Sequence, residues 1–154
     1  MKGLNPKLYQ HRIHLSRDMK PVAESHYRMN QNYAVKIEEI DKLLRVGFIR
    51  LVKQATWLSP IMVVPKKNGK IHITIDYRKL NAAIVINASL LPFTDGVLNW
   101  ITRHEVYSRH DSFSGYNQIR IHPDDQEKAT FVTKWGVFVF VVMMFGLKTT
   151  PAIF

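Results

Sequence analysis

The chain has 154 residues, a formal net charge of +10 and no cysteine. This length allows one domain with a hydrophobic core, and the lack of cysteine excludes disulfides and thiolate zinc sites. No apolar run is long enough to span a bilayer, and the N-terminus lacks the apolar stretch of a signal peptide. We therefore expect an intracellular protein without a membrane partner, in a compartment that the sequence does not specify.

The positive charge is concentrated in the first half of the chain. Residues 1–82 contain 16 Lys and Arg against 6 Asp and Glu, whereas residues 83–154 contain 6 of each. Such an asymmetry is typical of a protein that binds a polyanion, and nucleic acid is the leading candidate because phosphate contacts dominate its affinity. A basic surface without a partner is the other interpretation of the same counts.

The first half predicts an extended segment, a helix and a hairpin. Residues 1–26 show little periodicity, so we expect an extended lead-in. Residues 32–46 predict an amphipathic helix that ends at Gly47. Residues 61–64 and 70–76 predict a β-hairpin, because an apolar run and an alternating stretch flank an Asn-Gly turn. At its basic tip, Lys66 is either a phosphate contact or a solubilising charge.

The second half predicts shorter elements. They are a helix over 94–103, a strand over 104–111, a helical turn over 122–129, a hairpin of 129–133 with 137–142, and a helix start over 148–154. The mixture indicates an α+β fold.

Asp111 is the acidic residue with the clearest alternatives. It ends the expected strand over 104–111 and precedes a Ser- and Gly-containing turn. It either accepts hydrogen bonds from the turn or binds a hard divalent ion such as Mg²⁺. Two-metal chemistry needs several acids, and Asp124 and Asp125 are not expected to supply them, because their position after Pro123 predicts a solvated first helical turn. Tyr116 is either a core aromatic or a ring that stacks on a nucleotide.

Several segments together resemble one family. They are KIEEIDKLLRVGFIR, WLSPIMVVPKKNGKIHITIDYRKLN, LPFTDGV, DSFSGYNQIRIHPDDQEKATFVTKWGVF and MMFGLKTTPAIF, in this order. Over about residues 8–154 the chain resembles reverse transcriptases, and it looks most similar to the gypsy-type class of long-terminal-repeat retrotransposons, particularly plant elements. Several motifs in the right order are far more specific than any single motif.

The resemblance implies an incomplete right-hand polymerase fold, with fingers plus the first part of the palm. After the lead-in of residues 1–26, residues 27–154 would form a partial reverse transcriptase domain. The fingers would comprise about 27–90 and 119–154, and the start of the palm about 91–118.

The resemblance also implies roles for individual residues. Asp111 matches the first catalytic aspartate, which with the Ser112 carbonyl would bind Mg²⁺ or Mn²⁺. Tyr116 matches the residue under the incoming sugar that rejects ribonucleotides, and Ser114 and Gly115 would form the pocket floor beside it. The remaining matches are Lys66 and His72 for the triphosphate, Phe145 beside the nucleotide sugar and Arg78 for the template. The implied partners are an RNA or DNA template-primer and a dNTP.

Several departures from the family lead to an alternative. The family's Tyr-x-Asp-Asp hairpin is expected beyond Phe154, so this chain by itself is predicted not to polymerise. His72 stands where relatives usually have Arg, and Met144 where they have Pro. Arg109 and His110 replace apolar residues before Asp111, and Arg109 is expected to pair with Asp111. The alternative is a non-catalytic nucleic-acid-binding remnant, or the product of a pseudogene.

Overall fold

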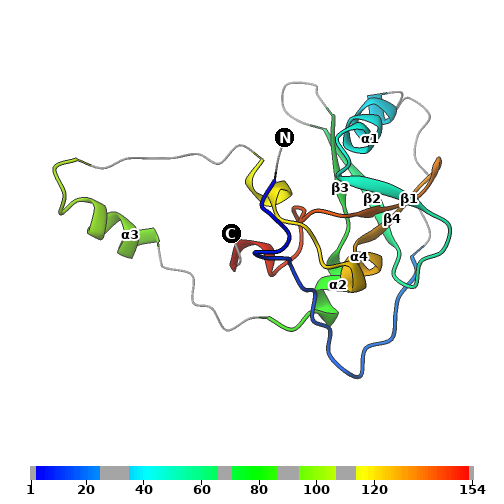
Figure 1. Cartoon of the computed structure of the whole chain (residues 1–154), viewed down its shortest axis with the longest axis horizontal. Coiled ribbons are helices and arrows are strands. Elements are labelled where there is room, and N and C mark those ends of the chain that lie inside the picture. The colour runs from blue at the N-terminus through cyan, green and yellow to red at the C-terminus, as the bar shows by residue number, and fades with distance from the viewer. Residues whose placement is uncertain (1–2, 25–34, 66–70, 87–93, 107–113, 153–154) are drawn as a thin grey trace.

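A five-stranded sheet forms the centre of the molecule. The computed structural model describes residues 3–24, 35–65, 71–86, 94–106 and 114–152. The sheet has the order β1-β5-β4-β2-β3, and its strands lie together on the right in Figure 1. Its strands are β1 (Ile49–Val52), β2 (Ser59–Pro65), β3 (Ile71–Ile75), β4 (Thr130–Thr133) and β5 (Gly136–Phe140). Together with the helices described below, the sheet confirms the predicted α+β class.

Both predicted hairpins are present and are joined into one sheet. The strands β2 and β3 pair antiparallel, with Ile61 opposite Ile75, and β4 and β5 pair antiparallel across a turn that ends at Gly136. The two hairpins meet where β2 runs parallel to β4, with Ser59 opposite Phe131. The short β1 adds antiparallel to the outer edge of β5. Apart from the hairpin turns, these contacts join segments far apart in the chain.

The predicted helix of the first half is confirmed as α1 (Val35–Arg45). It ends as expected at Gly47, which has a φ of +72°. The amide of Phe48 donates to the Leu43 carbonyl (2.9 Å) and the amide of Gly47 to the Leu44 carbonyl (3.0 Å). This pair of bonds satisfies two carbonyls at the helix end, and the positive φ favours glycine.

The remaining helices are short. They are α2 (Arg78–Ala83), α3 (Thr94–Ile101), α4 (Pro123–Gln126) and the 3₁₀ turns η1 (Gly115–Gln118), η2 (Glu127–Ala129) and η3 (Thr150–Ala152). Thus the predicted helix over 94–103 and helical turn over 122–129 are confirmed, and the expected helix start near Pro151 is a 3₁₀ turn. Residues 104–106 form no strand, and the rest of the strand expected over 104–111 lies outside the described residues. Within the described parts of the chain, no helix is long and apolar enough to cross a membrane.

Helix α3 stands away from the sheet (Figure 1). Its apolar side chains Val97, Leu98 and Trp100 are 38%, 53% and 66% exposed. Trp100 has a ring contact with His104, at a centroid distance of 4.9 Å. Isolated helices of this length are marginal in water, and these exposed side chains bury little apolar surface in α3.

The N-terminal segment is packed into the domain. Ile13 is 1% exposed and belongs to the hydrophobic core. His11 pairs with Ile121 through an isolated parallel bridge, in which the His11 amide donates to the Arg120 carbonyl (2.8 Å). Nearer the N-terminus, the Leu4 amide donates to the Gln118 carbonyl (2.8 Å). The segment therefore runs beside the stretch that follows η1.

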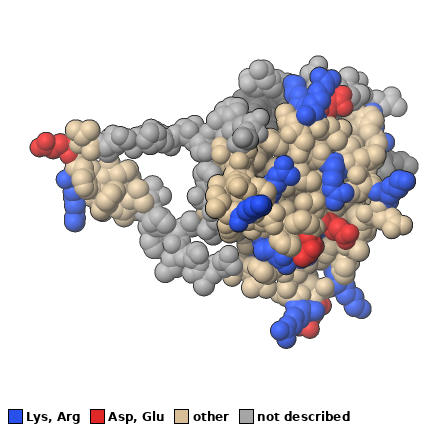
Figure 2. All heavy atoms as spheres, viewed as in Figure 1, with Lys and Arg blue, Asp and Glu red and all other residues tan. Residues whose placement is uncertain are grey.

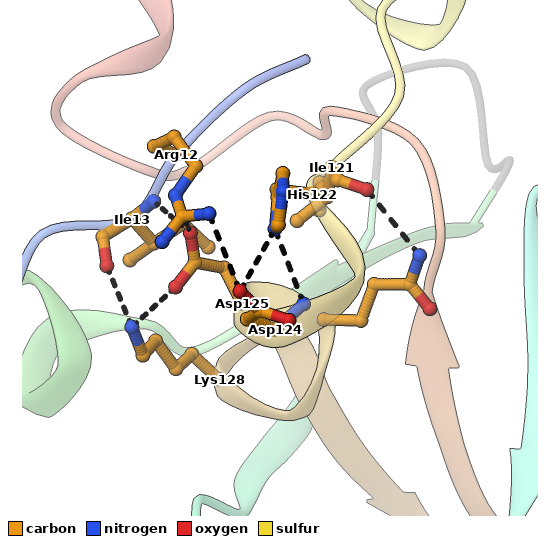
Figure 3. A network of polar contacts seen from close by, with 8 residues as sticks. Arg12, Ile13, Ile121, His122, Asp124, Asp125 and Lys128 are labelled. Carbon is orange, nitrogen blue, oxygen red and sulfur yellow. Dashed lines mark hydrogen bonds and ion pairs between the residues drawn. The ribbon is translucent and has the colours of Figure 1, made fainter. Parts of the chain in front are cut away.

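The carboxylate of Asp125 anchors this segment (Figure 3). Oδ2 accepts from the Ile13 amide (3.1 Å) and lies 2.9 Å from Arg12 Nε, while Oδ1 accepts from Lys128 Nζ (2.5 Å). Lys128 Nζ also donates to the Ile13 carbonyl (2.8 Å). Burial raises the pKa of Asp125, but the bonds from Lys128 and Ile13 and the nearby positive charges outweigh it and hold the pKa below its usual value.

This contact corrects the expectation that Asp124 and Asp125 are both solvated. The Asp124 side chain is 70% exposed, as expected, but that of Asp125 is 4% exposed. Both acids do lie in the first turn of α4, after Pro123. The expectation was wrong for Asp125 because its partners Arg12 and Ile13 come from the opposite end of the chain, which local sequence patterns do not reveal.

His11 lies beside this network and is fully buried. Among the described residues, neither of its ring nitrogens has a hydrogen-bond partner. Burial lowers the pKa of His11 to about 4, with an opposing effect of the Asp125 charge and a smaller lowering effect of His14. The folded state therefore favours the neutral ring, and the unfolded state takes up a proton first as the pH falls.

We predict that His11 makes the fold sensitive to mild acid. The folded pKa of His11 lies below the unfolded value, so its protonation costs no stability well above pH 6.5. The free energy of unfolding then falls as the pH drops toward 4, by about 2 kcal/mol at pH 5. Urea denaturation at pH 7.5 and pH 5 measures this loss. His11→Leu should remove most of the difference and be neutral or stabilising at pH 7.5, since it replaces unpartnered nitrogens by carbon. An equal loss in the variant would contradict the prediction.

Candidate functional site

A tight turn presents the residues that the resemblance assigns to the nucleotide pocket. Ser114 adopts the left-handed conformation, with φ 51° and ψ 40°, and leads into η1 at Gly115. The Asn117 side chain donates to Ser114 Oγ (2.7 Å), and the Asn117 amide donates to the Ser114 carbonyl (3.0 Å). A left-handed serine costs about 1 kcal/mol. The two bonds from Asn117 offset this strain and fix the direction in which Tyr116 leaves the turn.

Tyr116 meets Phe145 at the surface. Their ring centroids lie 4.6 Å apart and the planes make an angle of 81°, so one ring presents its edge to the other. This geometry is favourable for aromatic pairs. Phe145 is 73% exposed, while Tyr116 is half-buried. The structure thus brings together two predicted site residues from distant segments, and Tyr116 is neither a buried core residue nor an isolated surface ring.

Arg78 is held at the surface by a buried carboxylate. Arg78 Nη2 donates to Asp76 Oδ2 (2.7 Å) and Nε to Asp76 Oδ1 (2.9 Å), and the Arg78 amide also donates to Oδ1 (3.1 Å). The Asp76 side chain is 3% exposed, whereas that of Arg78 is 78% exposed. The hydrogen bonds from Arg78 hold the pKa of Asp76 below its usual value against the opposing effect of burial. Asp76 therefore stays ionised and orients the guanidinium.

The other predicted site residues fall where less is described. Lys66, Asp111 and Ser112 lie outside the described residues, as do Arg109 and His110. The backbone of His72 is in β3, opposite Val64 of β2. Within the residues that the structure describes, no group of three or more His, Asp or Glu is arranged to hold a metal ion. The roles of Asp111 and Ser112 in metal binding remain predictions.

Two residues near the site carry no role in the sequence analysis. Asp76 orients Arg78, and its signal is the spacing Asp-x-Arg at the end of a strand. Asn81 bonds the backbone beside Phe145, from which it is distant in the sequence. No local pattern predicts that contact, because it depends on how α2 packs against the segment after β5.

The fold is shared with part of a solved retroviral enzyme. Native prototype foamy virus protease-reverse transcriptase superposes with a TM-score of 0.77 and 24% identity, over 94% of this chain and 19% of that chain. A foamy viral protease-reverse transcriptase in complex with an RNA/DNA hybrid gives a TM-score of 0.76 at 22% identity, over 94% of this chain and 19% of the other. A foamy viral protease-reverse transcriptase in complex with dsDNA gives a TM-score of 0.72 at 21% identity, over 96% of this chain and 28% of the other. At these identities the likeness establishes the fold.

The sequence is similar to retrotransposon polyproteins. The transposon Tf2-3 polyprotein of Schizosaccharomyces pombe is 36% identical over 117 residues, which cover 76% of this chain and 9% of the polyprotein. The Tf2-7 polyprotein of the same organism is 35% identical over 117 residues, which again cover 76% of this chain and 9% of the polyprotein. No family model matches the chain. The chain is therefore homologous to a region of retrotransposon polyproteins and spans only 9% of their length, which confirms the predicted resemblance at this level.

We predict that Asp76→Asn destabilises the chain by about 1–3 kcal/mol at neutral pH, because it weakens bonds to a charged partner. The folded pKa of Asp76 lies below its unfolded value, so its contribution is present at neutral pH and is lost as the pH falls through the folded pKa. Urea denaturation of both proteins at neutral and strongly acidic pH tests this. The gap between them should narrow in acid, and a gap that is independent of pH would contradict the role of the charge.

Proposed function

We propose that the chain is part of a reverse transcriptase of a gypsy-type long-terminal-repeat retrotransposon and contributes its fingers and the first part of its palm. The motif order, the homology to Tf2 polyproteins and the foamy virus fold support this. One observation carries the proposal: Tyr116 and Phe145, both expected beside the nucleotide sugar, meet at a centroid distance of 4.6 Å. A chance resemblance of motifs gives no reason for that contact.

In the intact enzyme, the reaction would be template-directed addition of a dNTP to a primer 3′-hydroxyl. The Asp111 carboxylate and the Ser112 carbonyl are oxygen donors of the kind that Mg²⁺ and Mn²⁺ prefer. When bound, the metal would stabilise negative charge on the phosphate and on the attacking and leaving oxygens. The resemblance assigns the further acids of a two-metal site to a Tyr-x-Asp-Asp hairpin, a motif that does not occur in these 154 residues.

The remaining residues would bind and orient the nucleotide. The Tyr116 ring, with Phe145 against it, would lie under the sugar and crowd a 2′-hydroxyl, which favours a dNTP over a ribonucleotide. Lys66 would contact the triphosphate as a point charge. His72 would contribute less near neutral pH than an arginine, because a neutral imidazole lacks both the charge and the bidentate fork.

The basic first half would bind the template-primer. All the basic side chains of residues 1–82 that the structure describes are exposed: Lys7, Arg12, Arg17, Lys20, Lys42, Arg45, Arg50, Lys53, Arg78 and Lys79. Figure 2 shows Lys and Arg spread over the body of the molecule, with fewer acidic side chains among them. Foamy viral protease-reverse transcriptase, which shares the fold, is known in complex with an RNA/DNA hybrid. The same charge also supports a second candidate function, nucleic-acid binding without catalysis.

We predict that the 154-residue chain alone does not extend a primer. Asp111 is the single residue in these 154 that matches the family's metal-binding acids, and two-metal chemistry needs several. Primer extension on an RNA template with Mg²⁺ or Mn²⁺ measures this. Asp111→Asn is the matched control for contaminating polymerases, since it keeps the size of the side chain and removes its charge. Template-dependent product that this substitution abolishes would show the prediction to be wrong.

We predict that the chain binds an RNA/DNA hybrid in a salt-dependent manner and that Arg78→Ala lowers the slope of log affinity against log salt by about one. Fluorescence anisotropy with a labelled hybrid at several salt concentrations gives the slope. Lys134→Ala is the control. Lys134 is also exposed but lies in the turn between β4 and β5, outside the basic first half, so its loss should leave the slope unchanged. Binding without extension is expected under both candidates, whereas no binding at low salt excludes the non-catalytic function.

A further inference from the structure

Phe145 is a large aromatic side chain that burial does not position. It is 73% exposed, and its described ring contact is with Tyr116. The residues on either side of it in the chain are anchored, with Met144 4% and Leu147 2% exposed. A side chain so exposed keeps one direction only if the backbone that carries it is fixed.

Asn81 of α2 bonds this backbone at two points. Its Nδ2 donates to the Gly146 carbonyl (2.7 Å), and its Oδ1 accepts from the Lys148 amide (2.9 Å). The Asn81 side-chain amide thus bonds the backbone through both its nitrogen and its oxygen, at the first and the third residue after Phe145. No aspartate or leucine can make this pair of bonds, because the carbonyl needs a donor and the amide needs an acceptor.

Asn81 is itself fixed by the packing of α2. Its amide donates to the Tyr77 carbonyl (2.7 Å), and its neighbours Leu80 and Ala83 are 1% and 0% exposed. Tyr77 also lies close to the loop. Gly146 has a φ of +100°, and a Cβ placed there would lie 3.3 Å from the Tyr77 ring. The loop is therefore bonded to the Asn81 amide and has little free space beside the Tyr77 ring.

We propose that Asn81 is a positioning residue that holds Phe145 against Tyr116 and thereby sets the shape of the sugar side of the nucleotide pocket. The inference rests on the proposed function for the identity of the ligand, but the contact between the two rings does not depend on it. Asn81 acts through Gly146 and Lys148 and does not itself touch the nucleotide.

The first test concerns the rings alone. In NMR spectra of the wild-type chain, we expect nuclear Overhauser effects between the Tyr116 and Phe145 rings, and slow exchange of one Asn81 side-chain amide proton. Asn81→Ala removes both bonds, and Asn81→Asp keeps the acceptor for Lys148 but faces the Gly146 carbonyl with a carboxylate oxygen. In both variants, the nuclear Overhauser effects between the Tyr116 and Phe145 rings should be weaker than in the wild type.

Thr133→Ala is the matched control. Thr133 Oγ1 also makes two bonds to backbone, donating to the Gly136 carbonyl (3.1 Å) and accepting from the Trp135 amide (3.1 Å). It lies in the β4–β5 turn, so its loss should reduce stability without changing the contacts between the two rings. Unchanged contacts in both Asn81 variants would overturn the proposal. If the variants do not fold, fast exchange of both Asn81 side-chain protons in the wild-type chain would overturn it instead.

The second test adds the nucleotide. Titration of the chain with dATP and Mg²⁺ should shift the resonances of Gly115, Tyr116 and Gly146. Asn81→Ala should raise the dissociation constant about tenfold, because binding would then have to fix the direction of Phe145. Thr133→Ala should leave it unchanged. If the wild-type chain shows no shifts, the chain by itself does not form the proposed nucleotide pocket, while the nuclear Overhauser effects between the two rings still decide the role of Asn81. If Asn81→Ala binds dATP like the wild type, the positioning role in the pocket is wrong.

Discussion

The buried carboxylate of Asp125 is the contact on which the arrangement of this domain most depends. It is surrounded by Arg12, the Ile13 amide and Lys128, and these contacts join the N-terminal segment to α4 and η2. Removing a charge from water costs several kcal/mol unless partners replace the solvent, and here three donors do so. Loss of any one partner would leave a buried charge incompletely paired. The contact is thus a requirement for the register of the two segments rather than a large net source of stability.

The candidate site depends on the same region through Tyr77. This side chain is 2% exposed, and its hydroxyl donates to the Ala129 carbonyl (3.4 Å), one residue after Lys128. A Cβ placed at Gly146 would lie 3.3 Å from its ring, and its carbonyl accepts from the Asn81 amide. Tyr77 therefore connects the region around Asp125, through Ala129, with the loop that carries Phe145, through Asn81. Burial raises the pKa of Tyr77 well above its usual value, so the hydroxyl is protonated and able to donate at neutral pH.

The sequence predicted the local elements well and the long-range contacts poorly. Helix α1, its end at Gly47 and both hairpins follow from periodicity and turn residues, which act over a few positions. The resemblance assigned Tyr116 and Phe145 to one nucleotide pocket; their rings are in contact, and the pocket itself stays a prediction. By contrast, the burial of Asp125 was missed because Arg12 and Ile13 lie more than a hundred residues away. The same reason hides Asn81, whose bonds to the Phe145 loop arise only when α2 packs on the core.

The residues assigned to ligands share one physical problem, which is that they must be exposed and yet keep a fixed direction. Three different devices solve it in this chain. Tyr116 follows a strained left-handed Ser114 that two bonds from Asn117 stabilise. Arg78 is held by a buried carboxylate, and Phe145 by the amide of Asn81. Because Arg78 and Asn81 lie on the same six-residue helix α2, and so short a helix relies on tertiary packing, a displacement of α2 would move the proposed template and nucleotide contacts together. The alignment of the two ligands would then be a property of the packing of one helix rather than of either contact alone.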